Sequence, residues 1–375
     1  MDENLKRNVL LVSPYSHLKV GGICTWTKNV LDYYTNDGQC HLVLFNTAFR
    51  FKSNPSRIVF LRILYGFWDS LVVLSGLFFK LLRYKPQAIH YTSSASFALG
   101  KDLIAVHMAR LFGIRFIIHW HFGRIPQLAD RNSVEWKLLK FVAKAADSSI
   151  VLDRDSLVCL SKNGVKGVVM VPNPISISLQ EKSVLADFTS RSIDRGSFVF
   201  VGFVETNKGV FELVEACSQV DRVERLLLIG PVTKEVKDQL NGIASKRDRG
   251  EWLIWKGELP REEVIPYLYT ANALCLPSYS EGFPNVILEA MAVGCSVIAT
   301  RVGAIEEMMA SDDYGKAGIV IDLKNIGQLK QALNFMIDHP EKSREYGLNG
   351  RQRVLSKYTL DKVYPQYLSL WSELK

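Results

Sequence analysis

The sequence lacks the short motifs that mark several large classes of nucleotide-binding protein. It has no G-x-x-x-x-G-K-[S/T] phosphate loop and no G-x-G-x-x-G dinucleotide fingerprint. It also has no nucleic-acid-binding module and no basic tail, and its 46 lysines and arginines are scattered along 375 residues. The net charge of +8 fits phosphorylated small molecules, anionic lipid or simply a solvated basic surface, and we expect no nucleic-acid partner.

Paired cysteines are also absent. None of the six forms a C-x-x-C pair, and several lie in apolar runs, which is typical of buried, reduced thiols in a cytosolic protein. The first seven residues are polar and contain no apolar signal-peptide region, so we expect a cytoplasmic location. The cysteines are Cys24, Cys40, Cys159, Cys217, Cys275 and Cys295.

Charge is scarce between Ile58 and Leu82, where only Arg62, Asp69 and Lys80 are charged. A membrane span needs roughly 18 or more apolar residues with few or no charges, and Asp69 near the middle argues against one. We predict a buried amphipathic helix. An interfacial helix is the alternative, because the segment is rich in aromatic residues and ends in a basic stretch at residues 80–85.

Short apolar runs alternate with helical patterns along the whole chain, which predicts parallel sheets with right-handed crossovers. The strands expected in the first half are Asn8–Ser13, His41–Phe45, Ala88–Tyr91, Phe116–Trp120, Ser148–Leu152 and Val168–Val171. Those expected in the second half are Ser197–Val201, Arg225–Ile229, Trp252–Trp255, Ala273–Leu276, Ser296–Ala299 and Gly318–Ile321.

The segment Val171-Pro-Asn-Pro-Ile175 interrupts this alternation, because two prolines in three residues stop regular structure. Single cores stop growing near about 250–300 residues, so the length also favours two domains. We therefore predict an α/β protein of two Rossmann-like domains, residues 1–178 and 179–358, facing each other across a cleft. Residues 359–375 are expected to form an aromatic-rich helix. In open parallel sheets ligands bind beyond the carboxyl ends of the strands.

One such strand end carries the most informative motif, Leu276-Pro-Ser-Tyr-Ser-Glu-Gly-Phe-Pro-Asn-Val-Ile-Leu-Glu289. Glu281 lies in a Gly/Pro turn and Glu289 lies two helical turns further on. A helix N-terminus offers free N–H groups to phosphate, and carboxylates accept hydrogen bonds from sugar hydroxyls. The residues alone leave a second interpretation open, in which Glu281 is a helix-terminal acid and Glu289 a solvated helix residue.

A second strand end, Val201 to Gly209, places Gly202 and Lys208 in a loop before a helix, which suits a diphosphate. The alternative is an exposed loop lysine. A third loop contains Gly21 and Gly22, which allow close backbone approach to a ligand or make a plain flexible turn.

A fourth strand end holds His119, His121 and Arg124. Two histidines at i and i+2 share a face of a strand, but no third metal ligand is apparent. A hydrogen-bonded core histidine is the ordinary alternative. The triplet Asp153-Arg154-Asp155 has the form of a metal-binding Asp-x-Asp, and we interpret it as a solvated loop or helix start. We expect no metal and no cofactor.

The motif from Glu281 to Glu289 resembles the Glu-seven-residues-Glu motif of family 4 glycosyltransferases, which have the GT-B fold and retain anomeric configuration. The continuation Gly294–Glu307 is similar too. The resemblance implies that Glu281 contacts donor-sugar hydroxyls and that Glu289 contacts the ribose. It further implies that the segment Gly282-Phe283-Pro284-Asn285 binds the donor, with backbone N–H groups of Phe283 and Asn285 near the sugar.

The same resemblance assigns roles elsewhere in the chain. Lys208 would stabilise charge on the leaving phosphate, with Gly202 beside it. Gly21 and Gly22 would lie near the donor phosphates. His121 would lie near the transferred sugar, with His119 as the second choice. The C-terminal helix would pack back on the first domain.

One position departs from the family pattern. Phe203 stands where the family has an arginine after the first glycine, so one of two expected cations is missing. Arg124 is our candidate replacement.

These observations predict a metal-independent retaining hexosyltransferase that uses a nucleotide diphosphate sugar, with UDP favoured, in polysaccharide biosynthesis. The acceptor is expected to be a glycan or lipid-linked glycan, with peripheral contact to an anionic membrane at its cytoplasmic face. Two alternatives stay open: a sugar-nucleotide epimerase of the same fold, and a non-catalytic nucleotide-sugar-binding or scaffold subunit.

Overall fold

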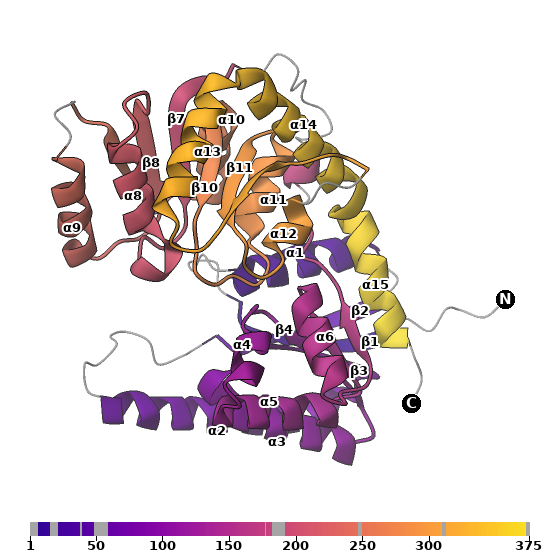
Figure 1. Ribbon diagram of the computed structural model, residues 1–375. Helices are drawn as coiled ribbons and strands as arrows, with labels where there is room; N and C mark the ends of the chain where they lie inside the picture. The colour runs from indigo at the N-terminus through magenta and orange to yellow at the C-terminus, as the bar shows by residue number, and fades with distance from the viewer. Residues whose placement is uncertain are drawn as a thin grey trace. The chain divides into compact units, whose positions relative to one another are not determined.

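The structure is a computed structural model that describes residues 7–15, 22–37, 40–48, 59–176, 178–181, 192–246, 250–309 and 313–372. The chain divides into two compact units (Figure 1). Unit 1 comprises Met1–Asn173 with Leu360–Lys375, and unit 2 comprises Pro174–Thr359. The division therefore falls after Asn173, within the Pro-Asn-Pro segment. The predicted boundary was residue 178.

Unit 1 contains a sheet of six parallel strands in the order β2-β1-β3-β4-β5-β6. The strands are β1 (Arg7–Ser13), β2 (Cys40–Asn46), β3 (Ala88–Ser93), β4 (Arg115–Trp120), β5 (Ser148–Val151) and β6 (Val168–Met170). The helices are α1 (Gly22–Asp37), α2 (Val59–Tyr84), η1 (Ser96–Ala98), α3 (Leu99–Leu111), α4 (Ile125–Asp130), α5 (Val134–Ala145), α6 (Arg154–Lys162) and α15 (Leu360–Ser372).

Unit 2 repeats this plan with six parallel strands in the order β12-β11-β10-β7-β8-β9. The strands are β7 (Asp194–Val201), β8 (Arg225–Ile229), β9 (Leu253–Gly257), β10 (Ala271–Leu276), β11 (Ser296–Thr300) and β12 (Gly318–Ile321). The helices are η2 (Thr206–Lys208), α8 (Val210–Ser218), α9 (Lys234–Ala244), α10 (Arg261–Thr270), α11 (Asn285–Ala292), α12 (Ile305–Met309), α13 (Ile326–Asp338) and α14 (Pro340–Lys357).

The predicted strands are all present, with ends that differ by at most three residues. Their sequences explain this agreement, because a parallel strand covered by helices on both faces must be apolar throughout. Every residue of β10 and β11 is buried, for example. The two doubly wound units confirm the predicted α/β class.

The C-terminal helix α15 packs in unit 1, far in sequence from its neighbours. The indole N–H of Trp26 on α1 donates to the hydroxyl of Tyr367 over 3.1 Å. The hydroxyl of Tyr34 donates to the carbonyl of Tyr364 over 2.7 Å. Aromatic residues of α15 therefore complete the core of unit 1.

Helix α2 corrects one prediction. Its inner face packs in the core of unit 1 through Leu77 and Leu81, and Asp69 is buried with it. Its outer face is apolar and exposed, so the prediction of a buried helix is wrong for that half. The stretch Tyr65–Tyr84 is long and apolar enough to cross a membrane, yet only 22% of its most apolar window is buried.

Candidate active site

The donor-site residues predicted for the second half follow two adjacent strands of unit 2, β7 and β10. The order β11-β10-β7 makes these strands neighbours. Lys208 lies in η2 after β7, and Glu281 lies in the loop after β10. Residues that are 73 positions apart in sequence are thereby brought to one edge of the sheet.

Backbone contacts lock these loops together. The N–H of Tyr279 donates to the carbonyl of Asn207 over 2.8 Å, and the N–H of Ala304 donates to that of Gly282 over 2.9 Å. Gly209 has φ +66°, and a Cβ there would lie 2.0 Å from the carbonyl oxygen of Pro277. A side chain at this position would therefore push the loop after β7 away from the loop after β10.

Lys208 and Glu281 form the central ion pair of this edge. The Nζ atom of Lys208 lies 2.8 Å from Oε1 of Glu281. The two side chains keep 22% and 12% of their surface exposed, so both remain within reach of a ligand. Desolvation at this level makes a charge-assisted hydrogen bond stronger than a surface pair.

Two helices begin beside this pair without a side-chain cap. The N-cap of α8 is Gly209 and that of α11 is Pro284, and neither makes a side-chain cap hydrogen bond. Uncapped N-termini present free N–H groups and the positive end of the helix dipole. Together with Lys208 they form an arrangement that suits a diphosphate. Gly282 to Asn285 lead directly into α11, as predicted.

Glu289 is buried on α11, and a residue that the sequence analysis missed pairs with it. Arg261, the first residue of α10, places its Nη2 atom 2.9 Å from Oε1 of Glu289. Burial raises the pKa of Glu289, while the Arg261 charge opposes that rise. Glu289 is therefore not the solvated helix residue of the alternative interpretation, because it is 8% exposed. No motif links Arg261 to it in the sequence.

A second missed group lies in the same loop. The hydroxyl of Tyr279 donates to Oε1 of Glu212 on α8 over 2.5 Å, and Lys324 lies 4.7 Å from the centre of the Tyr279 ring. Burial, together with the hydrogen bond to Glu212, raises the pKa of Tyr279 to about 12, so its hydroxyl remains a donor at neutral pH. This bond ties α8 to the loop that carries Glu281.

Phe203, which replaces the family arginine, is 54% exposed directly after Gly202. Gly202 has φ +148°, a conformation that favours glycine. The strand end after β7 therefore presents an apolar ring to solvent where the family pattern has a cation.

The predicted residues of unit 1 have different surroundings. Gly22 is the first residue of α1 and is exposed, with open space where a Cβ would lie. Gly21 lies outside the described residues. Arg124 makes an ion pair of 2.7 Å with Glu135, so its charge is already partly neutralised.

His119 belongs to a buried chain of hydrogen bonds. The indole N–H of Trp371 donates to Nδ1 of His90 over 3.1 Å. Since an indole can only donate, the proton of neutral His90 is on Nε2, which lies 3.2 Å from Nδ1 of His119. His119 therefore carries its own proton on Nε2. That buried atom has no hydrogen-bond partner among the described residues.

His121 lies beside this chain and is partly exposed. Its ring centroid is 3.9 Å from that of His119, and its buried Nε2 atom also has no partner within the described part of the chain. Burial lowers the pKa of His121 and that of His90 to about 3, and it holds that of His119 well below its ordinary value. All three imidazoles are therefore neutral at physiological pH.

The Asp-x-Asp triplet begins a helix, as predicted. Asp153 is the N-cap of α6, and its carboxylate accepts from the N–H of Ser156 over 2.8 Å. The prediction that it is solvated is wrong, since Asp153 is buried. Among the described residues no three His, Cys, Asp or Glu side chains are placed to hold a metal ion.

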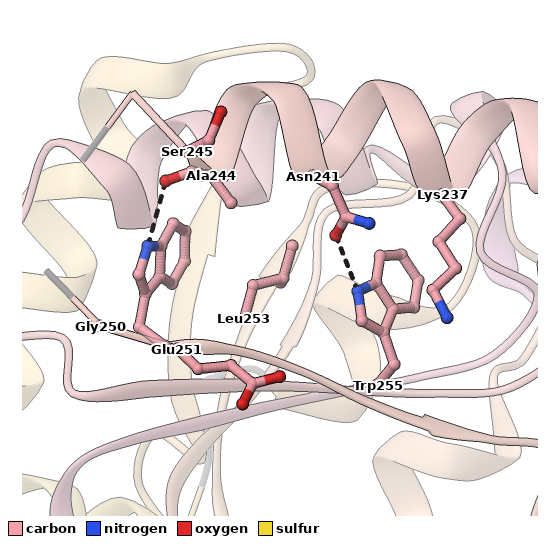
Figure 2. Close-up of a pocket in the computed structure, with 9 residues that line it drawn as sticks. Lys237, Asn241, Ala244, Ser245, Gly250, Glu251, Leu253 and Trp255 are labelled. Atoms are coloured by element: carbon pink, nitrogen blue, oxygen red, sulfur yellow. Dashed lines mark hydrogen bonds between the residues drawn. The ribbon is translucent and has the colours of Figure 1, made fainter. Parts of the chain in front are cut away.

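One hollow of about 460 Å³ lies apart from these residues, on α9 and β9 (Figure 2). The indole N–H of Trp255 donates to Asn241 over 3.0 Å, and that of Trp252 donates to the carbonyl of Ala244 over 3.4 Å. Both indoles are satisfied within the protein, and Lys237 lies over the Trp255 ring at 5.2 Å. None of the predicted site residues lines this hollow.

Comparison with known proteins agrees with the fold. Residues 189–353 match the family described as glycosyl transferases group 1. Alpha-maltose-1-phosphate synthase of Mycolicibacterium smegmatis is 28% identical over 304 residues, which cover 72% of this chain and 76% of that protein. Among solved structures, sucrose-phosphate synthase from Thermosynechococcus elongatus superposes with a TM-score of 0.74 at 18% identity, covering 98% of each chain. HepE of Anabaena, solved in complex with UDP, superposes with a TM-score of 0.69 at 14% identity, covering 98% of this chain and all of that one.

The two parallel six-stranded units have the GT-B fold, and a chain with this fold and these relatives is a glycosyltransferase. The match to the glycosyl transferases group 1 family is confined to residues 189–353, which lie within unit 2.

Proposed function

We propose that this chain is a family 4 glycosyltransferase that moves a hexose from a UDP-sugar to a glycan or lipid-linked glycan, with retention and without a metal ion. The observation that carries the proposal is the 2.8 Å pair of Lys208 and Glu281 between two uncapped helix N-termini. A cation and free N–H groups suit the diphosphate, and the adjacent carboxylate suits sugar hydroxyls.

Different residues bind different parts of the donor. Lys208 and the N-termini of α8 and α11 bind the diphosphate, and Glu281 accepts hydrogen bonds from the sugar. Glu289, held by Arg261, accepts from the two ribose hydroxyls. The choice of UDP is supported by HepE, a protein of the same fold that was solved with UDP.

The reaction breaks the bond between the anomeric carbon and the leaving phosphate oxygen. The acceptor hydroxyl forms a new bond to that carbon on the same face, and its proton passes to the leaving phosphate. Lys208 and the helix dipoles stabilise the charge that develops on the phosphate, which is the step where electrostatic stabilisation contributes most. No protein nucleophile is required.

His121 is assigned to substrate contact, because it is partly exposed and its Nε2 atom has no partner among the described residues. We propose that the acceptor binds to unit 1. We also propose that the enzyme acts in polysaccharide biosynthesis, on the cytoplasmic side of the membrane.

Substitution of the central pair tests the proposal. Lys208→Ala and Glu281→Gln should each lower kcat/KM by at least about 100-fold, because each removes an interaction with the charged transition state. Lys342→Ala is a matched control, since Lys342 makes a 2.8 Å pair with Glu345 on the exposed surface of α14. The site assignment is wrong if Lys208→Ala retains the turnover of the control.

A second candidate function is favoured by Phe203, which leaves the diphosphate site with one cation fewer than the family pattern. In this case the chain binds nucleotide sugar without turning it over. Thermal unfolding with UDP, GDP, ADP or dTDP in EDTA, followed by transfer assays, separates the two functions. A base-specific stabilisation with no transfer to any acceptor would favour the binding subunit.

A further inference from the structure

Helix α2 has two apolar faces, and only one of them is covered. Val73, Leu77 and Leu81 recur every four residues and are buried in the core of unit 1. The opposite face carries Phe79 and Leu82, which are 68% and 46% exposed. A helix on the surface of a globular domain normally has polar residues on its outer face. An exposed apolar face of this kind is typical of a binding surface.

The exposed apolar residues of the described chain are concentrated here. Of sixteen large exposed hydrophobic residues, eleven lie on α2, α3 and α5, the three helices that lie side by side on one face of the unit 1 sheet (Figure 1). The ring of Phe78 contacts that of Phe112 just after α3, with centroids 5.7 Å apart. We name this surface the helical face: Tyr65, Phe67, Trp68, Leu71, Phe78, Phe79, Leu82, Ile104, Leu111, Val134 and Phe141.

The same three helices carry a net positive charge. Their sequences contain eight lysines and arginines and three acidic residues. Asp69 and Asp102 are buried, and Glu135 is paired with Arg124. The helical face therefore combines aromatic side chains with a net positive charge, the combination that suits the boundary of an anionic bilayer.

The packing of helix α2 suits a position on such a boundary rather than across it. Crossing would surround the helix with lipid and remove its inner face from the core that it shares with β1 and β3. It would also place the carboxyl group of Asp69 in hydrocarbon. Docking by the outer face keeps both features where they are, and it leaves Lys80 and Arg83 at the level of the lipid headgroups.

We propose that the helical face docks this enzyme on an anionic phospholipid bilayer. The consequence for catalysis rests on the proposed function, since a docked enzyme shares a surface with a lipid-linked acceptor. The docking itself does not depend on which sugar is transferred.

Vesicle co-sedimentation of the full chain tests the docking. At low salt the protein should sediment with mixed phosphatidylcholine and phosphatidylglycerol vesicles and much less with phosphatidylcholine alone. The variant Phe79→Ser with Leu82→Ser should bind at least about ten-fold more weakly, because two apolar side chains no longer enter the bilayer. Leu323→Ser is the matched control, since Leu323 is 45% exposed on unit 2, and it should bind like the wild type.

The outcomes are distinct. Failure of the wild type to bind either kind of vesicle overturns the proposal, as does equal binding by the double variant. A dimer in sedimentation velocity that the double variant dissociates, without vesicle binding, assigns the face to a second copy of the chain. Transfer to a water-soluble acceptor should be unchanged in the double variant. Loss of that activity in Lys208→Ala reports on the proposed function alone.

Discussion

At the scale of single residues, the buried pair of Arg261 and Glu289 shows how the site controls a carboxylate. A carboxyl group that is 8% exposed costs free energy to ionise, and burial raises its pKa accordingly. The Arg261 guanidinium at 2.9 Å opposes the rise and also fixes the direction of the carboxylate. Arg261 is therefore a positioning residue for Glu289.

Removal of that cation predicts a pH-dependent donor affinity. In Arg261→Gln the pKa of Glu289 should rise further, so the carboxyl should gain a proton at a higher pH than it does in the wild type. A protonated carboxyl accepts hydrogen bonds from a ribose less well, and KM for the donor should rise on the acid side. Initial rates at several pH values measure this. Glu289→Gln should have a high KM throughout, and a flat profile in Arg261→Gln would contradict the argument.

The sequence identified part of this site for a clear reason. Lys208 and Glu281 each lie directly after an apolar strand, where the geometry of a parallel sheet brings side chains together. Arg261 begins a helix that follows an exposed strand end, and Tyr279 and Glu212 lie on separate elements. Their pairing is formed by the tertiary structure, and no local sequence pattern predicts it.

At the scale of elements, helix α15 provides the hydrogen-bond donor at one end of the chain formed by His90 and His119. Trp371 donates to His90, and Tyr367 accepts from Trp26, so these buried groups are satisfied by neutral partners. The described neighbours of His90 and His119 in this cluster are aromatic side chains and one another. Protonation of either histidine would bury a charge without a carboxylate among those neighbours.

The cluster predicts a loss of stability in mild acid. The pKa of His90 and of His121 is lowered from 6.5 to about 3, so below pH 6.5 the unfolded chain binds protons that the folded chain does not. Stability should therefore fall with the pH through that window, by up to about 1.4 kcal/mol per pH unit for each histidine. Denaturant midpoints at pH 7.5 and 5.5 measure the change.

Two variants give this measurement its controls. His107→Gln removes an exposed histidine and should leave the pH dependence unchanged. His119→Gln removes one of the three imidazoles whose pKa is lowered and should make the pH dependence shallower. Equal stability of the wild type at both pH values would show that the histidines are not buried in neutral form.

At the scale of the whole molecule, the sequence predicted the architecture well because parallel sheets leave a strong pattern. The strands of both units are rich in apolar residues, and the Pro-Asn-Pro segment marks the division between units. The outer face of α2 was mispredicted because an apolar helix has the same composition whether both faces are covered or one is exposed. Only the packed structure shows which face the core covers.

The division into two units predicts how ligand binding affects unfolding. The predicted donor-binding residues lie in unit 2, apart from Gly21 and Gly22. UDP at 100 times its Kd should stabilise the unit that binds it by about 2.7 kcal/mol. In calorimetry, UDP should raise the midpoint temperature of the unfolding transition of unit 2 more than that of unit 1. The transition of unit 1 is recognised by its sensitivity to acid, because the histidine cluster lies in that unit. An equal shift of both would place the nucleotide contacts on both units.

The locked loops of unit 2 limit how this enzyme could be given a new donor. A Cβ at Gly303 would lie 2.3 Å from the carbonyl oxygen of Glu281, much as one at Gly209 would meet Pro277. Inserting or deleting residues in one loop would shift its neighbours and disturb the pair of Lys208 and Glu281. A directed-evolution library should therefore hold the loop lengths and both glycines constant. It should vary side chains that face solvent, beginning with Phe203.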